Sequence, residues 1–174
     1  MLFRSQLPSQ AGWFLVAYFV SAALALPGWA KVSAAIGESR AWLFAMLVSI
    51  GVFIWAAQLD AGALLPFALI CVLSGAALGA DLAMPPALLA GVIAAAGDSG
   101  KREGAYFGLW TFATKMNLAL AAGISLPLLS WLGYVPGQAS EAGLRGLVLA
   151  YAVLPCALKL AAAALLWHAP LKDV

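Results

Sequence analysis

Five long apolar stretches take up most of this 174-residue chain. They cover about residues 12–30, 41–59, 63–96, 104–132 and 144–167. A helix that crosses the hydrocarbon core of a bilayer needs about 20 mainly apolar residues. Because that core offers no water to unpaired backbone groups, such stretches fold there as helices. The pattern therefore predicts an all-α polytopic membrane protein with five transmembrane helices, forming a single membrane domain over residues 1–174.

Charged residues are scarce along the whole chain. They make up 9% of it, whereas 65% of the residues are hydrophobic; soluble domains carry about 25% charged residues. A net charge of +2 is too small to hold a nucleic acid. The sequence has no H-E-x-x-H, G-x-S-x-G or Walker motif. We therefore expect neither a soluble enzyme nor a nucleic-acid-binding protein, and no catalytic residue, metal site or cofactor.

The third apolar stretch is too long for a simple span. A helix over residues 63–96 would measure roughly 50 Å, against a hydrocarbon core of about 30 Å. Pro85 and Pro86 interrupt it, and proline removes a backbone donor from a helix. We expect one span, kinked at these prolines, that extends beyond the membrane. The alternative is a re-entrant pair of helices.

The basic residues predict the orientation in the membrane. With five spans, alternate connecting segments lie on opposite sides. One side then holds Lys31, Arg40, Lys101, Arg102 and Lys172, and the other holds only Arg4 and Arg145. By the positive-inside rule, the N-terminus lies outside, and the C-terminus and the loops 31–40 and 97–103 are cytoplasmic. The expected location is a bacterial-type inner or plasma membrane.

One lysine lies deep in an apolar stretch. Lys115 is about 11 residues, or roughly 17 Å, beyond Gly104, which places it near the bilayer midplane. A lysine there costs about 2.5–3.5 kcal/mol on insertion. Asp81 has a similar depth in the preceding stretch, so we expect these two charges to neutralise each other. The pair either lines a path for a solute or ion, or only locks two helices together.

Thr111 and Trp110, near Lys115, admit two interpretations each. Thr111 lies one helical turn before Lys115 on the same face, where it faces the same path or bonds its own backbone. Trp110 stacks on a sugar ring or faces lipid. Lys159, near the end of the last stretch, is expected to extend its ammonium toward the cytoplasmic headgroups.

The cytoplasmic segment 97–103 is rich in glycine and charge. In the simpler interpretation Asp98 or Ser99 caps the next helix, and the basic pair only follows the topology rule. In the other, charged residues of the two cytoplasmic loops form a gate whose ion pairs break and re-form during transport. The candidate gate residues are Lys101, Arg102, Glu103 and Arg40.

Several segments together resemble one transporter family. They are Ala80–Pro86, Gly100–Lys115, Leu129–Tyr134 and Leu154–Lys159. In combination they are similar to the glycoside–pentoside–hexuronide:cation symporters, which include the melibiose carrier and belong to the major facilitator superfamily. Members of that family have twelve spans in two six-helix bundles. The resemblance implies that the five stretches here correspond to the last five spans, in the C-terminal bundle.

The resemblance also implies a function. It indicates secondary active symport of a sugar-like or glycoside-like solute with a cation, by alternating access. It matches Lys115 to the lysine that faces the family's sugar and ion path, and Thr111 to the polar position one turn earlier. The acids that the family has near the end of the tenth span are absent from Gly91–Ala96.

Coupling to the cation is expected to involve parts other than this chain. The family's cation-binding acids lie in the N-terminal bundle, so Na⁺ or H⁺ is the expected coupling ion, with no site here. The expected chain is a fragment or half-carrier, truncated after its seventh span and completed by the missing N-terminal bundle or a partner subunit. Two alternatives stay open: a non-transporting subunit that packs on a larger membrane partner, and an inactive product of a truncated reading frame.

Overall fold

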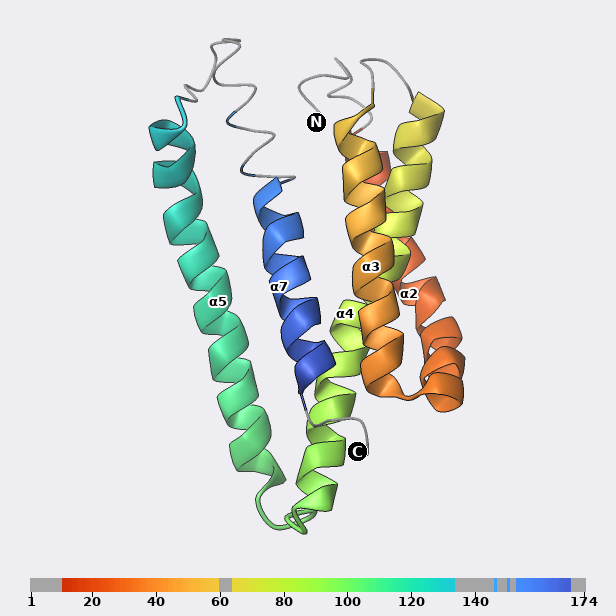
Figure 1. Cartoon of the computed structure of the whole chain (residues 1–174), viewed down its shortest axis with the longest axis vertical. Helices are drawn as coiled ribbons and strands as arrows, with labels where there is room; N and C mark the ends of the chain where they lie inside the picture. The colour runs from red at the N-terminus through yellow and green to blue at the C-terminus, as the bar shows by residue number, and fades with distance from the viewer. Residues whose placement is uncertain (1–10, 60–63, 134–145, 147–149, 151–152, 170–174) are drawn as a thin grey trace. The chain divides into compact units, whose positions relative to one another are not determined.

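The computed structural model describes residues 11–59, 64–133, 146, 150 and 153–169. These residues form helices and contain no strand, which confirms the all-α prediction. In chain order the helices are α2 (Ala11–Ile36), α3 (Glu38–Ala57), α4 (Leu64–Ala95), α5 (Glu103–Trp131) and α7 (Leu154–His168) (Figure 1).

Four of the described helices, α2 to α5, are long and apolar enough to cross a membrane. The last helix, α7, is apolar but has 15 residues. Most of the chain between residues 144 and 153 lies outside the described residues, so the fifth transmembrane helix stays a prediction. Arg4, Arg145 and Lys172, which entered the orientation argument, also lie outside them.

The long helix α4 continues through both of its prolines. It runs without a break for 32 residues, with Pro85 and Pro86 inside it. The alternative of a re-entrant pair is therefore wrong, because such a pair needs a turn within this stretch. The kink expected at the prolines stays a prediction.

The expected cytoplasmic loop 31–40 is reduced to one residue. Helix α2 ends at Ile36 and α3 begins at Glu38, so only Gly37 separates them. The φ angle of Gly37 is 86°, in the left-handed region that glycine adopts without a side-chain clash. Its N–H donates to the carbonyl oxygen of Ser33 at 2.8 Å, which closes the end of α2. The hydropathy pattern predicted a loop here because polar residues flank this point, but the helices extend through them.

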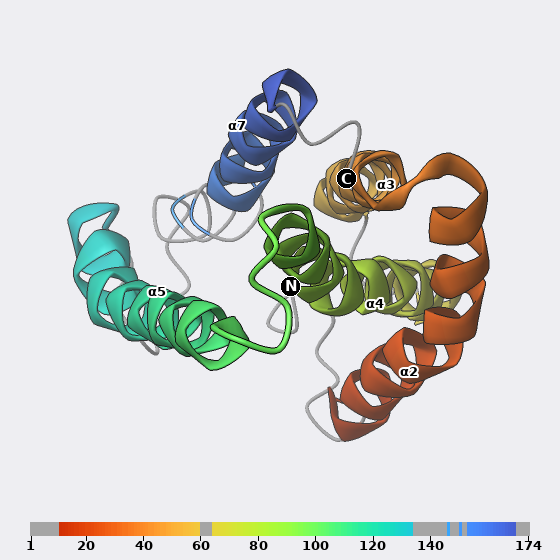
Figure 2. The same cartoon turned by 90° about the horizontal axis from the view of Figure 1, so that it is seen from below.

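The chain divides into two compact units, one formed by residues 1–88 with 159–174 and the other by residues 89–158. In the first unit, α2 and α3 lie along the first part of α4 (Figure 2). Three alanines and one methionine form a buried cluster between α3 and α4: Ala41, Ala45, Ala80 and Met84. A second cluster joins the end of α7 to both helices: Met46, Leu88, Ala163 and Leu166.

Helix α2 is hydrogen-bonded to the backbone of α4. The indole N–H of Trp29 donates to the carbonyl oxygen of Ala76 at 2.7 Å. The hydroxyl of Ser21 donates to the carbonyl oxygen of Val72 at 2.6 Å. Both polar side chains thus find partners on α4, and the bond of Trp29 is partly buried, where an unpaired group is costly.

Two glycines of α4 allow this close approach. A Cβ atom at Gly79 would lie 2.7 Å from the carbonyl oxygen of Ala22, and one at Gly75 would collide with the carbonyl oxygen of Tyr18. Both obstacles are backbone atoms of α2, which cannot move aside as a flexible side chain can. Small residues bring membrane helices together in this way, since lipid provides no hydrophobic force between them.

The outward surfaces of the helices are apolar. Trp13 is 76% exposed, and Leu24 and Leu65 are each 75% exposed. Water-soluble monomers seldom expose large contiguous apolar surfaces. These surfaces suit contact with lipid.

The glycine contact generates a stability prediction. Substitution Gly79→Ala should lower the free energy of unfolding by about 1–3 kcal/mol, because the added methyl group pushes α2 away from α4. The matched control is Gly51→Ala on α3, where no atom lies within 4 Å of the new Cβ. Thermal unfolding of the purified protein in detergent measures both. Equal stability of the two variants would contradict the close contact.

Candidate functional site

Asp81, about midway along α4, is bound by side chains of two other helices. Its Oδ1 accepts a hydrogen bond from the indole N–H of Trp42 on α3, at 3.0 Å. Its Oδ2 accepts one from Nζ of Lys159 on α7, at 2.5 Å, in an ion pair. The Lys159 and Asp81 side chains are 22% and 28% exposed. One carboxylate therefore joins α3, α4 and α7.

The ammonium of Lys159 has a second partner. It donates to the hydroxyl oxygen of Ser49 on α3 at 3.1 Å, and Ser49 is only 3% exposed. An ionised group away from water is tolerated when it is both paired and hydrogen-bonded. Asp81 and Lys159 meet this requirement together, because each has one partner besides the other. We call Trp42, Ser49, Asp81 and Lys159 the charge cluster.

The charge cluster corrects one sequence-based expectation. The expectation that Lys159 extends toward the headgroups is wrong, because its ammonium turns inward onto α3 and α4. The cation that the structure shows at Asp81 is Lys159, whereas the expected pairing of Asp81 with Lys115, which lies in the second unit, stays a prediction. Depth along a helix could be estimated from the sequence, but the neighbour at that depth depends on how the helices rotate and pack.

Sequence reasoning missed Ser49 and Trp42 altogether. A serine and a tryptophan are common in membrane helices, so neither residue stands out in an apolar stretch. The one available signal was that Asp81 and Lys159 are opposite charges within apolar segments, since such charges tend to pair.

The other candidate path residues lie on α5, in the second unit. Lys115 follows Glu103 by roughly 18 Å along the helix. Lys115, Thr111 and Trp110 are exposed in the structure, and within its described part Lys115 has no hydrogen-bond or ion-pair partner. Trp110 accepts a hydrogen bond at its carbonyl oxygen from the hydroxyl of Thr114, at 2.8 Å. A site shared by Asp81 and the α5 residues stays a prediction.

Glycine ends α4 at the turn toward α5. Gly97 has a φ angle of 73°, and its N–H donates to the carbonyl oxygen of Ala94 at 3.0 Å. The N–H of Asp98 donates to the carbonyl oxygen of Ile93 at 3.2 Å. This pair of bonds is the Schellman motif, which satisfies carbonyl groups at the end of a helix.

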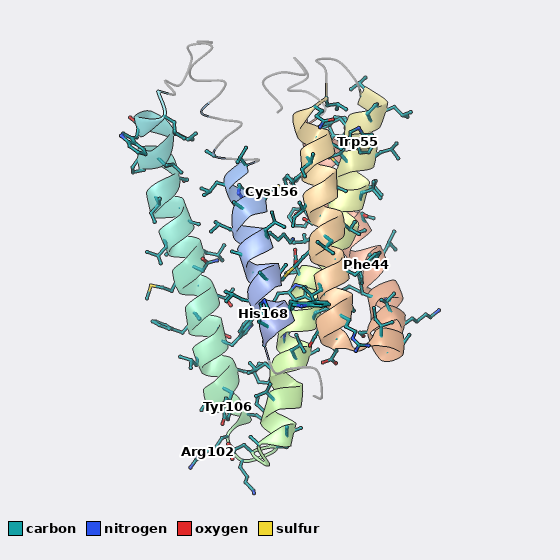
Figure 3. The ribbon with its side chains drawn as sticks, in the orientation of Figure 1. Phe44, Trp55, Arg102, Tyr106, Cys156 and His168 are labelled. Atoms are coloured by element: carbon teal, nitrogen blue, oxygen red, sulfur yellow. The ribbon has the colours of Figure 1, made fainter. Side chains whose placement is uncertain are left out.

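A side-chain hydrogen bond ties the start of α5 to this turn. The hydroxyl of Tyr106 donates to Oδ2 of Asp98 at 2.9 Å. Figure 3 shows Tyr106 and Arg102 at the turn between α4 and α5. The expected capping of α5 by Asp98 or Ser99 is wrong: Arg102 is the N-cap residue and makes no side-chain capping bond.

The candidate gate residues of this turn make local contacts. Oε1 of Glu103 accepts a hydrogen bond from the N–H of Gly100 at 3.0 Å. Nζ of Lys101 donates to the carbonyl oxygen of Gly97 at 3.3 Å. Arg40, the fourth candidate, lies exposed in the first turn of α3. The gate itself stays a prediction.

The charge cluster predicts non-additive effects of substitution. Asp81→Asn and Lys159→Met should each lower the free energy of unfolding by about 1–3 kcal/mol, because each leaves an unpaired charge away from bulk water. In the double variant, the free energy of unfolding should fall by at least about 1 kcal/mol less than the sum of the two single losses, because no unpaired charge remains. Thermal unfolding in detergent measures the stability of the wild type, both single variants and the double variant. Additive losses would show that the pair contributes no coupling energy.

Comparison with known proteins places the chain in a family. A family model described as "MFS/sugar transport protein" matches residues 6–173. The comparisons with curated proteins and with solved structures gave no match. The matched region contains all five described helices, of which four are long and apolar enough to cross a membrane. The chain therefore belongs to the MFS/sugar transport protein family of the major facilitator superfamily.

Proposed function

We propose that this chain forms part of the transport path of a sugar or glycoside carrier that is driven by a cation gradient. Membership in the sugar transport family supports the solute class. The cation coupling rests on the resemblance of Gly100–Lys115 to the glycoside–pentoside–hexuronide:cation symporters. The path would be completed by an N-terminal bundle or a partner subunit.

The observation on which this proposal mainly depends is the position of Lys115 within α5. This lysine is the single basic residue between the first turn and the end of α5, a helix of 29 residues. Insertion of a lysine at such depth costs about 2.5–3.5 kcal/mol, and residues of this kind in membrane proteins usually face a cavity or a transport path. Its ammonium has three donors, which suit the hydroxyl groups of a sugar or an anionic substituent.

Two residues about one turn before Lys115 on α5 also belong to the proposed path. Thr111 lies four residues earlier, one helical turn away, and offers a hydroxyl to the same solute. Trp110 offers an aromatic face for a sugar ring. In this proposal Asp81 belongs to the ion side of the path.

The proposed topology follows the basic residues. The N-terminus lies outside, and the turn 97–103 lies in the cytoplasm of a bacterial-type cell. Lys101, Arg102, Glu103 and Arg40 then belong to a cytoplasmic gate that opens as the two bundles rock.

The first test replaces the central lysine. Lys115→Leu should reduce uptake by at least about tenfold, because it removes a charged hydrogen-bond donor from the solute. Cells that express the natural gene are assayed with radiolabelled glycosides, pentoses and hexuronates, and immunoblots of the membranes confirm insertion. The control is Lys31→Leu, at an exposed position of α2 outside the proposed path. Normal uptake by Lys115→Leu would contradict the role of Lys115.

The second test concerns the driving force. Uptake into membrane vesicles should rise when either a Na⁺ gradient or a pH gradient is imposed in the inward direction, because symport couples the two movements. The measurement compares each gradient with no gradient at equal ionic strength. Uptake that responds to neither gradient would contradict symport and leave passive transport of the same solutes.

A further inference from the structure

One side-chain hydrogen bond joins the first turn of α5 to a residue outside the helix. The hydroxyl of Tyr106 donates to Oδ2 of Asp98 at 2.9 Å, in a partly buried contact. Asp98 lies five residues before the start of α5, whereas Tyr106 is the fourth residue of the helix. Hydrogen bonds to a carboxylate are stronger than those between neutral groups. The bond therefore restrains the direction in which Tyr106 points.

The backbone of Asp98 is itself fixed to the end of α4. Its N–H donates to the carbonyl oxygen of Ile93 at 3.2 Å, and Ile93 is 1% exposed. Its carbonyl oxygen accepts hydrogen bonds from the N–H groups of Lys101 and Arg102, at 3.0 and 3.2 Å. Because these bonds hold Asp98 from both sides, its carboxylate occupies a defined place beside the end of α4. Tyr106 is thus bonded to a fixed partner.

The middle of α5 has no comparable attachment among the described residues. Each of the residues 108–124 is exposed. The next buried side chain is that of Leu129, near the other end of the helix, at 4% exposure. Packing along the middle of α5 therefore does not determine how the helix is rotated about its own axis. Contacts near its two ends determine that rotation.

The rotation of α5 decides where its polar side chains point. Lys115 follows Tyr106 by nine residues, which places it about 180° around the helix from Tyr106. Thr111 lies about 140° from Tyr106, whereas Trp110 lies about 40° from it. While Tyr106 points toward Asp98, Lys115 and Thr111 therefore point to the opposite side of α5.

We propose that Asp98 and Tyr106 are positioning residues, whose hydrogen bond fixes the rotation of α5 and thereby presents Lys115 and Thr111 to the solute. The effect on the solute rests on the proposed function, whereas the effect on α5 does not. Without the bond, α5 occupies several rotations, and only part of the population is competent to bind. The apparent affinity for a ligand falls in proportion to the competent fraction. At saturation, the solute selects the competent rotation and restores it.

Uptake kinetics of the conservative variant Tyr106→Phe test this role. The variant keeps the aromatic ring and removes only the hydroxyl. It should raise the glycoside concentration at half-maximal uptake by about threefold to tenfold, as expected for the loss of one hydrogen bond. The maximal rate per carrier, with the carrier measured by immunoblot, should stay close to that of the wild type. A merely structural role would lower the amount of carrier and leave the half-saturating concentration unchanged.

The matched control for Tyr106→Phe is Ser125→Ala, which also removes a hydroxyl from α5. The hydroxyl of Ser125 donates to the carbonyl oxygen of Ala122 in the same helix, at 3.0 Å, so it does not restrain the rotation of α5. Its half-saturating concentration should equal that of the wild type. An unchanged half-saturating concentration in Tyr106→Phe overturns the positioning role.

Variants of Asp98 test the other end of the bond. Asp98→Asn keeps an oxygen acceptor for the hydroxyl, so its half-saturating concentration should stay near that of the wild type. Asp98→Ala should match Tyr106→Phe. The two changes combined should give no further increase, because the same bond is already lost. A further increase would show that the two residues act separately, which overturns the proposal.

Spin labels test the rotation of α5 without any solute. The labels are attached to Ala94→Cys at the end of α4 and Leu118→Cys on α5, exposed positions within the second unit. Both natural cysteines of the purified full chain are replaced by serine. Because a label stands away from the helix axis, rotation of α5 changes the distance between the labels. Double electron–electron resonance should give a broader distance distribution in Tyr106→Phe than without that change, and no broadening in Ser125→Ala. A distribution that does not broaden in Tyr106→Phe overturns the proposal.

The two kinds of measurement separate this inference from the proposed function. A wild type that takes up none of the tested glycosides contradicts the proposed function. The spin-label result then decides the effect on α5: broadening in Tyr106→Phe supports it, and an unchanged distribution overturns it. A wild type that takes up glycosides supports the proposed function, even where Tyr106→Phe leaves the half-saturating concentration unchanged and thereby overturns the positioning role.

Discussion

Water does not reach the apolar core of a bilayer, so each polar group placed there needs a partner that the chain supplies. Among the described residues, no buried side-chain nitrogen or oxygen atom lacks a hydrogen-bond partner. The first unit meets this requirement in two ways. Ser21 and Trp29 use carbonyl oxygens of α4, and Asp81 and Lys159 use each other together with Trp42 and Ser49.

Close packing makes these polar bonds possible. An indole or hydroxyl group reaches a carbonyl oxygen of the next helix only when the two backbones come near each other. Gly75 and Gly79 remove the side chains that would hold α2 and α4 apart. The alanines at the contact of α3 with α4 act in the same way, and they bring Trp42 within reach of Asp81.

The sequence was sufficient to predict the helices but not their neighbours. Hydropathy locates membrane helices well because the bilayer admits few other structures. Helices α4 and α5 agree with the predicted stretches 63–96 and 104–132 to within a residue at each end, whereas α2 continues to Ile36, past the predicted end at residue 30. The single-residue link at Gly37 was missed, because polar residues at a membrane surface are compatible with either a loop or a helix. The pairing of Asp81 was also missed: hydropathy gives depth in the membrane, whereas the partner depends on the rotation of each helix and on which helices touch.

The attachments of α2 and α7 in the first unit differ in how they respond to their surroundings. Helix α2 is joined to α4 through backbone carbonyl oxygens, which neither gain nor lose protons in the physiological range. The part of α7 from Lys159 onward is joined through an ion pair as well as apolar contacts. Ionic strength and nearby charges therefore act more strongly on the α7 attachment than on that of α2. The first unit thus holds α2 by hydrogen bonds between neutral groups and α7 in part by opposite charges.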